Sequence, residues 1–344
     1  NCRRHRMLKI LEVTFPFFAL VLLGWFAARR RWMPLEAIPG LNYFVLYLAL
    51  PAMLLRFAAT TPIARMFDLS LFGTWLACAL AMVGLAVLLA RRQRIGWNDA
   101  AFGALVAAFS NSGFMGVPLL VDLLGQGAAA PAIVTLAIDM VITSSLCIAL
   151  SRLGSHDSQG ASRAALNALK GMLVNPLPWA ITAGCLISAW QLALPHVLMK
   201  PVGLLADAAS PTALFTLGAV LARSQLQARA GAVTGAVAGV VAGVVAGVEA
   251  GAIRRSDVPV VVGLKLVVHP LLVYLAGRLV IALGWPLDPQ AAVVLALVAA
   301  LPSASNVPML AERFGADAGR IARIVLLTTA LAFGTFTAMV ALLT

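Results

Sequence analysis

Charged side chains are scarce in this chain. Only 11% of its 344 residues are Asp, Glu, Lys or Arg, and 62% are apolar, whereas soluble domains have roughly 25% charged and about 45–50% apolar residues. This composition excludes a soluble globular protein. A membrane span needs about 20 mostly apolar residues. We therefore expect an all-α polytopic membrane protein with ten transmembrane helices.

The sequence also lacks the motifs of several soluble functions. Its four cysteines have no motif spacing, so neither a disulfide framework nor a zinc site is expected. A phosphate-binding loop is missing, so ATP-driven transport would require another subunit. The net charge of +12 comes from short arginine clusters between apolar runs, as at 29–31 and 91–94, which is typical of cytoplasmic loops rather than of a nucleic-acid surface. We expect the lipid bilayer as a partner, no nucleic acid and no cofactor.

Ten apolar runs predict the spans, and they form two sets of five. A polar cytoplasmic linker at 151–172 separates a first repeat, 7–150, from a second, 173–344; Met7 is the more natural start of the chain. The predicted spans are 8–28, 38–58, 69–90, 99–124, 129–150, 173–194, 202–222, 259–282, 291–313 and 321–343.

The two sets resemble each other. Each has a proline in its second span, Pro51 and Pro211, and an interrupted fourth span. The spacings between matching prolines agree if the second set carries an insertion, which we assign to a Gly-rich segment at about 226–255. Because five spans is an odd number, the second repeat must run inverted through the membrane. Inverted repeats with broken helices are the architecture of secondary transporters.

Charge placement sets the predicted orientation. Most Lys and Arg residues, Arg320 among them, fall in loops after odd-numbered spans. The positive-inside rule then places both termini on the non-cytoplasmic side of an inner (plasma) membrane. An eleventh span in the glycine tract 231–251 is the alternative. It would erode the charge asymmetry, so we expect a cytoplasmic insertion there.

The interrupted spans supply the candidate substrate site. They read FSNSGFMGVPLL at 109–120 and LPSASNVPMLAERFG at 301–315. Proline breaks a helix and suits the first turn of the next one, and broken backbone at bilayer depth occurs only inside protein or along a cavity. Free amides at two half-helix N-termini would bind an anion, with asparagine carboxamides adding donors. Simple proline kinks are the competing interpretation. The candidate site residues are Asn111, Ser112, Gly113, Gly116, Pro118, Ser303, Ser305, Asn306 and Pro308.

Four ionisable residues lie within predicted spans: Asp139, Asp207, Lys265 and His269. Each costs about 2.5–3.5 kcal/mol at a helix centre, so we expect them to face the bundle interior. Lys265 and His269 are four residues apart and share a helix face. Lys265 could pair with Asp139, with Asp207 or with the substrate. The group could serve charge or proton coupling, or it could simply hold helices together.

Several segments together resemble the auxin efflux carrier family, in particular its bacterial malonate-transporter-like permeases. They are LNYFVLYLALPAMLLRFA, FSNSGFMGVPLL, KLVVHP and LPSASNVPMLAERFG followed by LLTTALAFGTF. The resemblance implies ten helices in a scaffold and a transport domain, carboxylate substrates and homodimerisation. It also implies a substrate site where helices 4 and 9 cross, which matches Asn111, Gly113, Gly116, Pro118, Pro302, Asn306 and Pro308. Pro308 stands where the family pattern has a small residue.

The sequence therefore predicts a secondary active transporter for a small organic anion such as malonate or another mono- or dicarboxylate. It would work by alternating access at the helix 4/9 crossover and couple to protons or sodium. A sodium-coupled symporter resembling the bile-acid carriers and a passive anion channel are the alternatives. We expect no enzyme, because Ser110 or Ser112 with His269 is the only candidate catalytic pair and nothing in their spacing brings them together.

Overall fold

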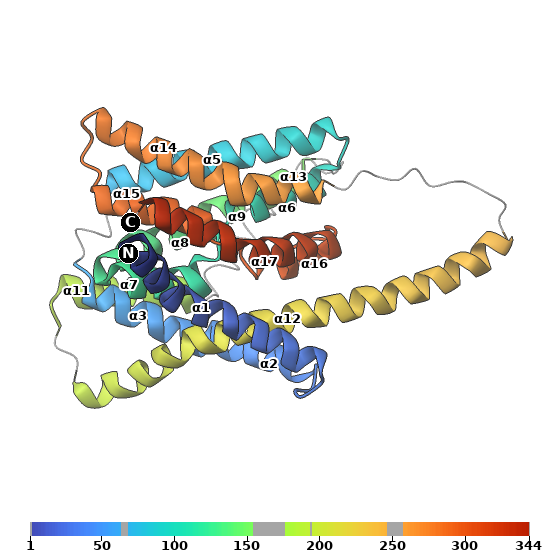
Figure 1. Cartoon of the computed structure of the whole chain (residues 1–344), viewed down its shortest axis with the longest axis horizontal. Helices are drawn as coiled ribbons and strands as arrows, with labels where there is room; N and C mark the ends of the chain where they lie inside the picture. The colour runs from blue at the N-terminus through green and yellow to red at the C-terminus, as the bar shows by residue number, and fades with distance from the viewer. Residues whose placement is uncertain (1, 63–67, 154–175, 193–194, 246–256, 344) are drawn as a thin grey trace.

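The computed structural model describes residues 2–62, 68–153, 176–192, 195–245 and 257–343, and these are helical, with no named strand among them (Figure 1). The α-helices are α1 (Cys2–Arg29), α2 (Ala37–Phe44), α3 (Leu50–Thr60), α5 (Leu69–Arg92), α6 (Trp97–Ala108), α7 (Val117–Leu124), α8 (Ala129–Ile138), α9 (Ser144–Ser151), α11 (Pro176–Ala189), α12 (His196–Val245), α13 (Val258–Gly263), α14 (His269–Ala282), α15 (Pro289–Ala300), α16 (Val307–Arg313) and α17 (Ala318–Leu343). Four π-helical turns, η1 (Val45–Ala49), η2 (Ser112–Gly116), η4 (Asp139–Thr143) and η5 (Leu264–Val268), and a 3-10 turn, η3 (Gln126–Ala128), join neighbouring helices.

Every predicted apolar run contains a helix. Among the described residues, six helical stretches are long and apolar enough to cross a membrane: Ala37–Thr60, Leu69–Arg92, Gln126–Ser151, His196–Arg223, Val258–Ala282 and Ala318–Leu343. Four shorter apolar helices occupy the remaining runs: Phe15–Arg29, Ser112–Leu124, Pro176–Ala189 and Pro289–Ala300. The chain is therefore a multi-pass membrane protein.

The helices pack as two groups. The α12 group consists of α1, α2, η1, α3, α11 and α12, in which α12 lies against α1 and α3, and α3 also contacts α11. The crossover group consists of α5 to α9 and α13 to α17 with their π turns; here α5 packs on α6 and α14, and α14 on α15. In Figure 1 the α12 group lies along one side of the molecule, and α7, α8 and α17 of the crossover group contact it.

Glycines bring α1 and α12 together closely. A Cβ atom on Gly24 would collide with the backbone oxygen of Phe215, and one on Gly218 with the backbone oxygen of Val21. Small residues allow this approach between helix backbones, which is how membrane helices gain packing energy. The α1–α12 pair is thus a closely fitted unit.

Prolines explain three of the four π turns. Pro51, Pro118 and Pro270 each lie in the first turn of the helix that follows η1, η2 or η5. A proline has no amide hydrogen and its ring clashes with the carbonyl four residues earlier, so the preceding turn widens. The fourth turn, η4, contains no proline; there the Ser144 hydroxyl donates to the Asp139 carbonyl over 2.8 Å.

The glycine tract is helical as far as it is described. Residues 231–245 continue α12 without a break, and Figure 1 shows this end of α12 projecting beyond the other helices. The rest of the tract, residues 246–251, and most of the predicted linker 151–172 lie outside the described residues. The insertion and the repeat boundaries stay predictions.

Candidate functional site

Two helices end at the centre of the crossover group instead of crossing it. The first, α6, stops at Ala108, and Phe109 is extended with φ −77° and ψ 112°. The chain resumes as a helix at Ser112. The second, α15, stops at Ala300, and Leu301 is extended with ψ 156°, as expected of a residue before proline. The helix resumes at Val307.

The two extended segments pair with each other. Ser110 and Ser303 form an antiparallel bridge; the Asn111 amide donates to Pro302 O over 2.9 Å, and the Ala304 amide donates to Phe109 O over 3.0 Å. These bonds satisfy backbone groups that the broken helices leave free, which buried polar groups require. We call residues 109–111 with 301–306 the crossover.

Side chains tighten the crossover. Ser303 Oγ donates to Val106 O over 2.7 Å, and the Ser303 amide contacts Thr328 Oγ1 at 3.3 Å. Gly116 lies under Leu301: a Cβ on Gly116 would come within 2.8 Å of the leucine Cδ1. The predicted residue Ser303 thus stabilises the crossover together with Ser110, which was not a predicted site residue, and the predicted Gly116 leaves the necessary space.

A small cavity of ≈ 20 Å³ lies where the crossover meets the α12 group. Its crossover side consists of Phe114, Ser305, Asn306 and Met309, and its other side comes from α2, η1 and α12, lined by Asn42, Val45, Ala213, Thr216, Leu217 and Val220. This volume accommodates about one water molecule.

Unused polar groups lie at this cavity and beside it. Thr216 Oγ1 is buried without a hydrogen-bond partner in the described part of the chain, and so is Asn111 Nδ2. Asn306 occupies the N-cap position of α16, but its side chain makes no capping hydrogen bond. Buried polar atoms are normally hydrogen-bonded, so these groups have hydrogen-bonding capacity that the described residues do not use. Of the predicted residues, Ser305 and Asn306 line the small cavity, whereas Ser112 and Ser303 are fully buried.

A second, wider cavity of ≈ 400 Å³ lies between the same two groups, toward the C-terminal ends of α3 and α7. Its walls are Arg56, Phe57, Thr60, Thr61 and Pro62 on the α12 group and Val121, Asp122, Gln126, Gly127 and Ala130 on the crossover group. At the small cavity, Asn42 Nδ2 contacts Met309 Sδ at 3.5 Å across the two groups. The space between the two groups is thus wide near the C-terminal ends of α3 and α7 and narrow at Ser305 and Asn306 of the crossover.

Three of the four predicted ionisable residues gather behind the crossover. Lys265 is fully buried, and its Nζ donates to Ser110 Oγ over 2.5 Å and lies 3.1 Å from His269 Nδ1. Asp139, also fully buried, accepts hydrogen bonds at Oδ1 from Trp75 Nε1 and Thr143 Oγ1, over 3.0 and 3.1 Å. We call Asp139, Lys265 and His269 the buried triad.

Asp207 lies elsewhere. Its carboxylate pairs with Arg56 at 2.7 Å, and 68% of the aspartate side chain is exposed. Lys265 therefore has Asp139, not Asp207, as its neighbouring carboxylate. The sequence alone left these two pairings open.

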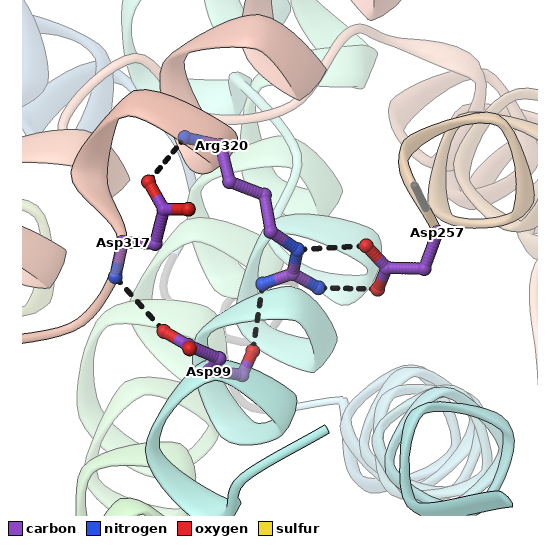
Figure 2. Close-up of polar contacts among 4 residues, drawn as sticks. All are labelled: Asp99, Asp257, Asp317 and Arg320. Carbon is purple, nitrogen blue, oxygen red and sulfur yellow. Dashed lines mark hydrogen bonds and ion pairs between the residues drawn. The ribbon is translucent and has the colours of Figure 1, made fainter. Parts of the chain in front are cut away.

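A further charged cluster was not predicted as a cluster at all (Figure 2). Arg320, only 8% exposed, directs its guanidinium at both oxygens of Asp257, with Nε 2.8 Å from Oδ1. Its Nη1 donates to the Asp99 carbonyl over 2.9 Å, and the Asp99 carboxylate accepts from the Asp317 amide over 2.8 Å. Gly103 leaves room for the guanidinium. The cluster thus connects three elements: Asp99 lies in the first turn of α6, Arg320 in the first turn of α17, and Asp257 immediately before α13.

Comparison with known proteins identifies the family. The sequence pattern of the family described as "Membrane transport protein" matches residues 9–340. The chain is also 28% identical over 341 residues, 98% of this chain and 97% of the relative, to a protein of Rhizobium meliloti (strain 1021) named "Putative malonate transporter". Family membership points to a transporter with a small-molecule substrate rather than to an enzyme. The chain belongs to the membrane transport protein family, the auxin efflux carrier family that its broken spans resemble.

Proposed function

We propose that this protein is a secondary active carrier for a small organic anion, a mono- or dicarboxylate of the size of malonate. The observation that carries the proposal is the cavity at Ser305 and Asn306, which the crossover shares with Asn42 and Thr216 of the α12 group. A carboxylate needs several hydrogen-bond donors, and the carboxamides and hydroxyls around this cavity can supply them. The relative's name supports malonate as the first substrate to try.

The two cavities support alternating access. The narrow cavity lies at the crossover and the wide one toward the C-terminal ends of α3 and α7, and both lie between the same two helix groups. Malonate does not fit into ≈ 20 Å³, so the crossover group must move relative to the α12 group when the substrate binds. On the predicted ten-span inverted topology, the wide cavity opens to the non-cytoplasmic side of an inner membrane. The α12 group then corresponds to the scaffold, which would also carry any homodimer contact.

Transport by the purified protein in liposomes tests the proposal. Labelled malonate uptake should saturate, and Asn306→Ala should raise the KM roughly 10- to 150-fold, since a hydrogen bond to a charged group contributes about 1.5–3 kcal/mol. Asn98→Ala is the matched control, because the Asn98 carboxamide donates to Phe314 O, away from the cavity; its KM should stay within about twofold. An unchanged KM in Asn306→Ala would place the substrate elsewhere.

A further inference from the structure

The buried triad contains a carboxylate oxygen that accepts no hydrogen bond of normal geometry from the described residues. Asp139 Oδ1 has two donors, but Oδ2 is buried and has no hydrogen-bond partner in the described part of the chain. Lys265 lies near enough for the two charges to interact. However, no carboxylate of the described residues lies within ion-pair distance of its ammonium group. A buried carboxylate with one unpaired oxygen destabilises the fold. A contribution to stability therefore does not explain its presence.

The histidine of the triad cannot easily take the same role. When Lys265 is charged, its Nζ donates to His269 Nδ1 over 3.1 Å. Hydrogen then resides on His269 Nε2, which is buried and has no partner among the described residues. In this tautomer Nδ1 already accepts a hydrogen bond and Nε2 already carries a hydrogen, so neither nitrogen is available to accept a proton. Among the described residues, the titratable groups that interact with Asp139 are Lys265 and Cys147 from α9, and neither an ammonium group nor a thiol accepts a further proton. His269 interacts with Lys265.

The triad is connected to the proposed anion site through the crossover. Lys265 Nζ donates to Ser110 Oγ over 2.5 Å. Ser110 forms the antiparallel bridge with Ser303, and Asn306 follows Ser303 by three residues in the chain. An anion that binds at the crossover would interact electrostatically with the positive charge of Lys265. Asp139 then loses part of the electrostatic compensation for its own negative charge. In a low-dielectric interior such interactions are strong.

We propose that Asp139 takes up one proton at Oδ2 as the anion binds at the crossover, so that each anion crosses the membrane together with one proton. This inference rests on the proposed carrier function. The proton comes from the solvent on the side to which the site is open and leaves on the other side. Binding is reciprocal: if the anion favours the proton, the proton favours the anion by the same factor. Asp139, Lys265 and the crossover all belong to the crossover group, so proton and anion move together.

Proton movement and anion flux measured in the same liposomes test this inference. The vesicles contain a pH-sensitive dye, and the membrane voltage is clamped at zero with potassium and valinomycin. Labelled malonate is added outside, and protein-free vesicles report diffusion of the protonated acid. We expect one proton per malonate. We also expect about tenfold accumulation for each unit by which the inside is more alkaline, since one pH unit corresponds to a tenfold ratio at equilibrium.

Asp139→Asn should retain exchange of internal for external malonate but lose both the proton signal and the accumulation driven by the pH gradient. Asp207→Asn, the same substitution at an exposed aspartate, should behave like the wild type. Wild-type stoichiometry remains informative if Asp139→Asn does not fold.

Three results would overturn the inference while leaving the carrier in place. They are saturable malonate flux without proton movement, flux driven by a sodium gradient instead, and loss of coupling in His269→Gln but not in Asp139→Asn. Absence of saturable flux in the wild type would instead refute the proposed function itself.

Discussion

The Arg320–Asp257 pair gives the sharpest prediction of stability. Only 10% of the arginine side chain and 5% of the aspartate side chain are exposed. Asp257→Asn leaves the guanidinium with the Asp99 carbonyl as its main partner. Removing one member of a buried ion pair costs about 3–5 kcal/mol, because the other charge remains desolvated. Arg320→Met should lower the free energy of unfolding by a similar amount, since it leaves the buried Asp257 carboxylate without its charged partner.

The double variant Asp257→Leu/Arg320→Met separates this explanation from a simple loss of packing. Apolar replacement of a whole buried pair is often neutral, so the double variant should be more stable than either single variant. Thermal unfolding in detergent, followed by tryptophan fluorescence, is the assay. At about 2 °C per kcal/mol, each single variant should lower the midpoint by roughly 6–10 °C.

The Arg56–Asp207 pair is the matched control. With 31% and 68% of its side chains exposed, it should contribute only about 0–1 kcal/mol, so Asp207→Asn should leave the midpoint nearly unchanged. The reasoning is refuted if Arg320→Met and Asp207→Asn shift the midpoint equally, or if the double variant loses as much as the two single variants added together.

Three further substitutions test other parts of the account. Thr216→Val keeps the shape of the cavity wall but removes its unpaired hydroxyl; it should raise the KM for malonate by about threefold to tenfold, and an unchanged KM would remove Thr216 from the site. Gly218→Leu should separate α1 from α12, because even a Cβ meets Val21 O, and the thermal midpoint should fall markedly. Gly73→Ala, at a position where an added Cβ meets nothing within 4 Å, should not lower it. Lys265→Met removes the buried ammonium that holds Ser110; malonate affinity should fall at least tenfold, and full affinity would show that the triad does not act on the crossover.

The sequence predicted the helices and the breaks well because both follow from local chemistry. Apolar runs of span length define helices such as α5 and α17, whose bounds agree with the prediction within three residues. Pro308 lies in the first turn of the second half of its broken helix, as expected of proline. Pro118 lies in the first turn of α7, but there the helical chain already resumes at Ser112 as the π turn η2. The helical course of residues 231–245 was harder to foresee: glycine every fourth residue lowers helix propensity, yet α12 continues through it.

The site's partners could not be predicted, because they depend on which helices become neighbours. Asp139 and Asp207 looked equivalent in the sequence, but only Asp139 lies on a helix that packs toward Lys265. Arg320 was counted with the cytoplasmic loop charges, and no local pattern connects it to Asp257, 63 residues away. Thr216 lies in an apolar run without a motif. Its contribution to the cavity follows only from the packing of α12 against the crossover.

Counterflow tests the central claim, a carrier that exposes one anion site alternately to each side, most directly. Liposomes that contain the protein are loaded with unlabelled malonate and diluted into a trace of labelled malonate. A carrier predicts that label accumulates transiently inside to well above its external concentration, and that Asn306→Ala reduces this overshoot. Label that only equilibrates, at a rate that does not saturate with malonate, would contradict the account and indicate a passive pore.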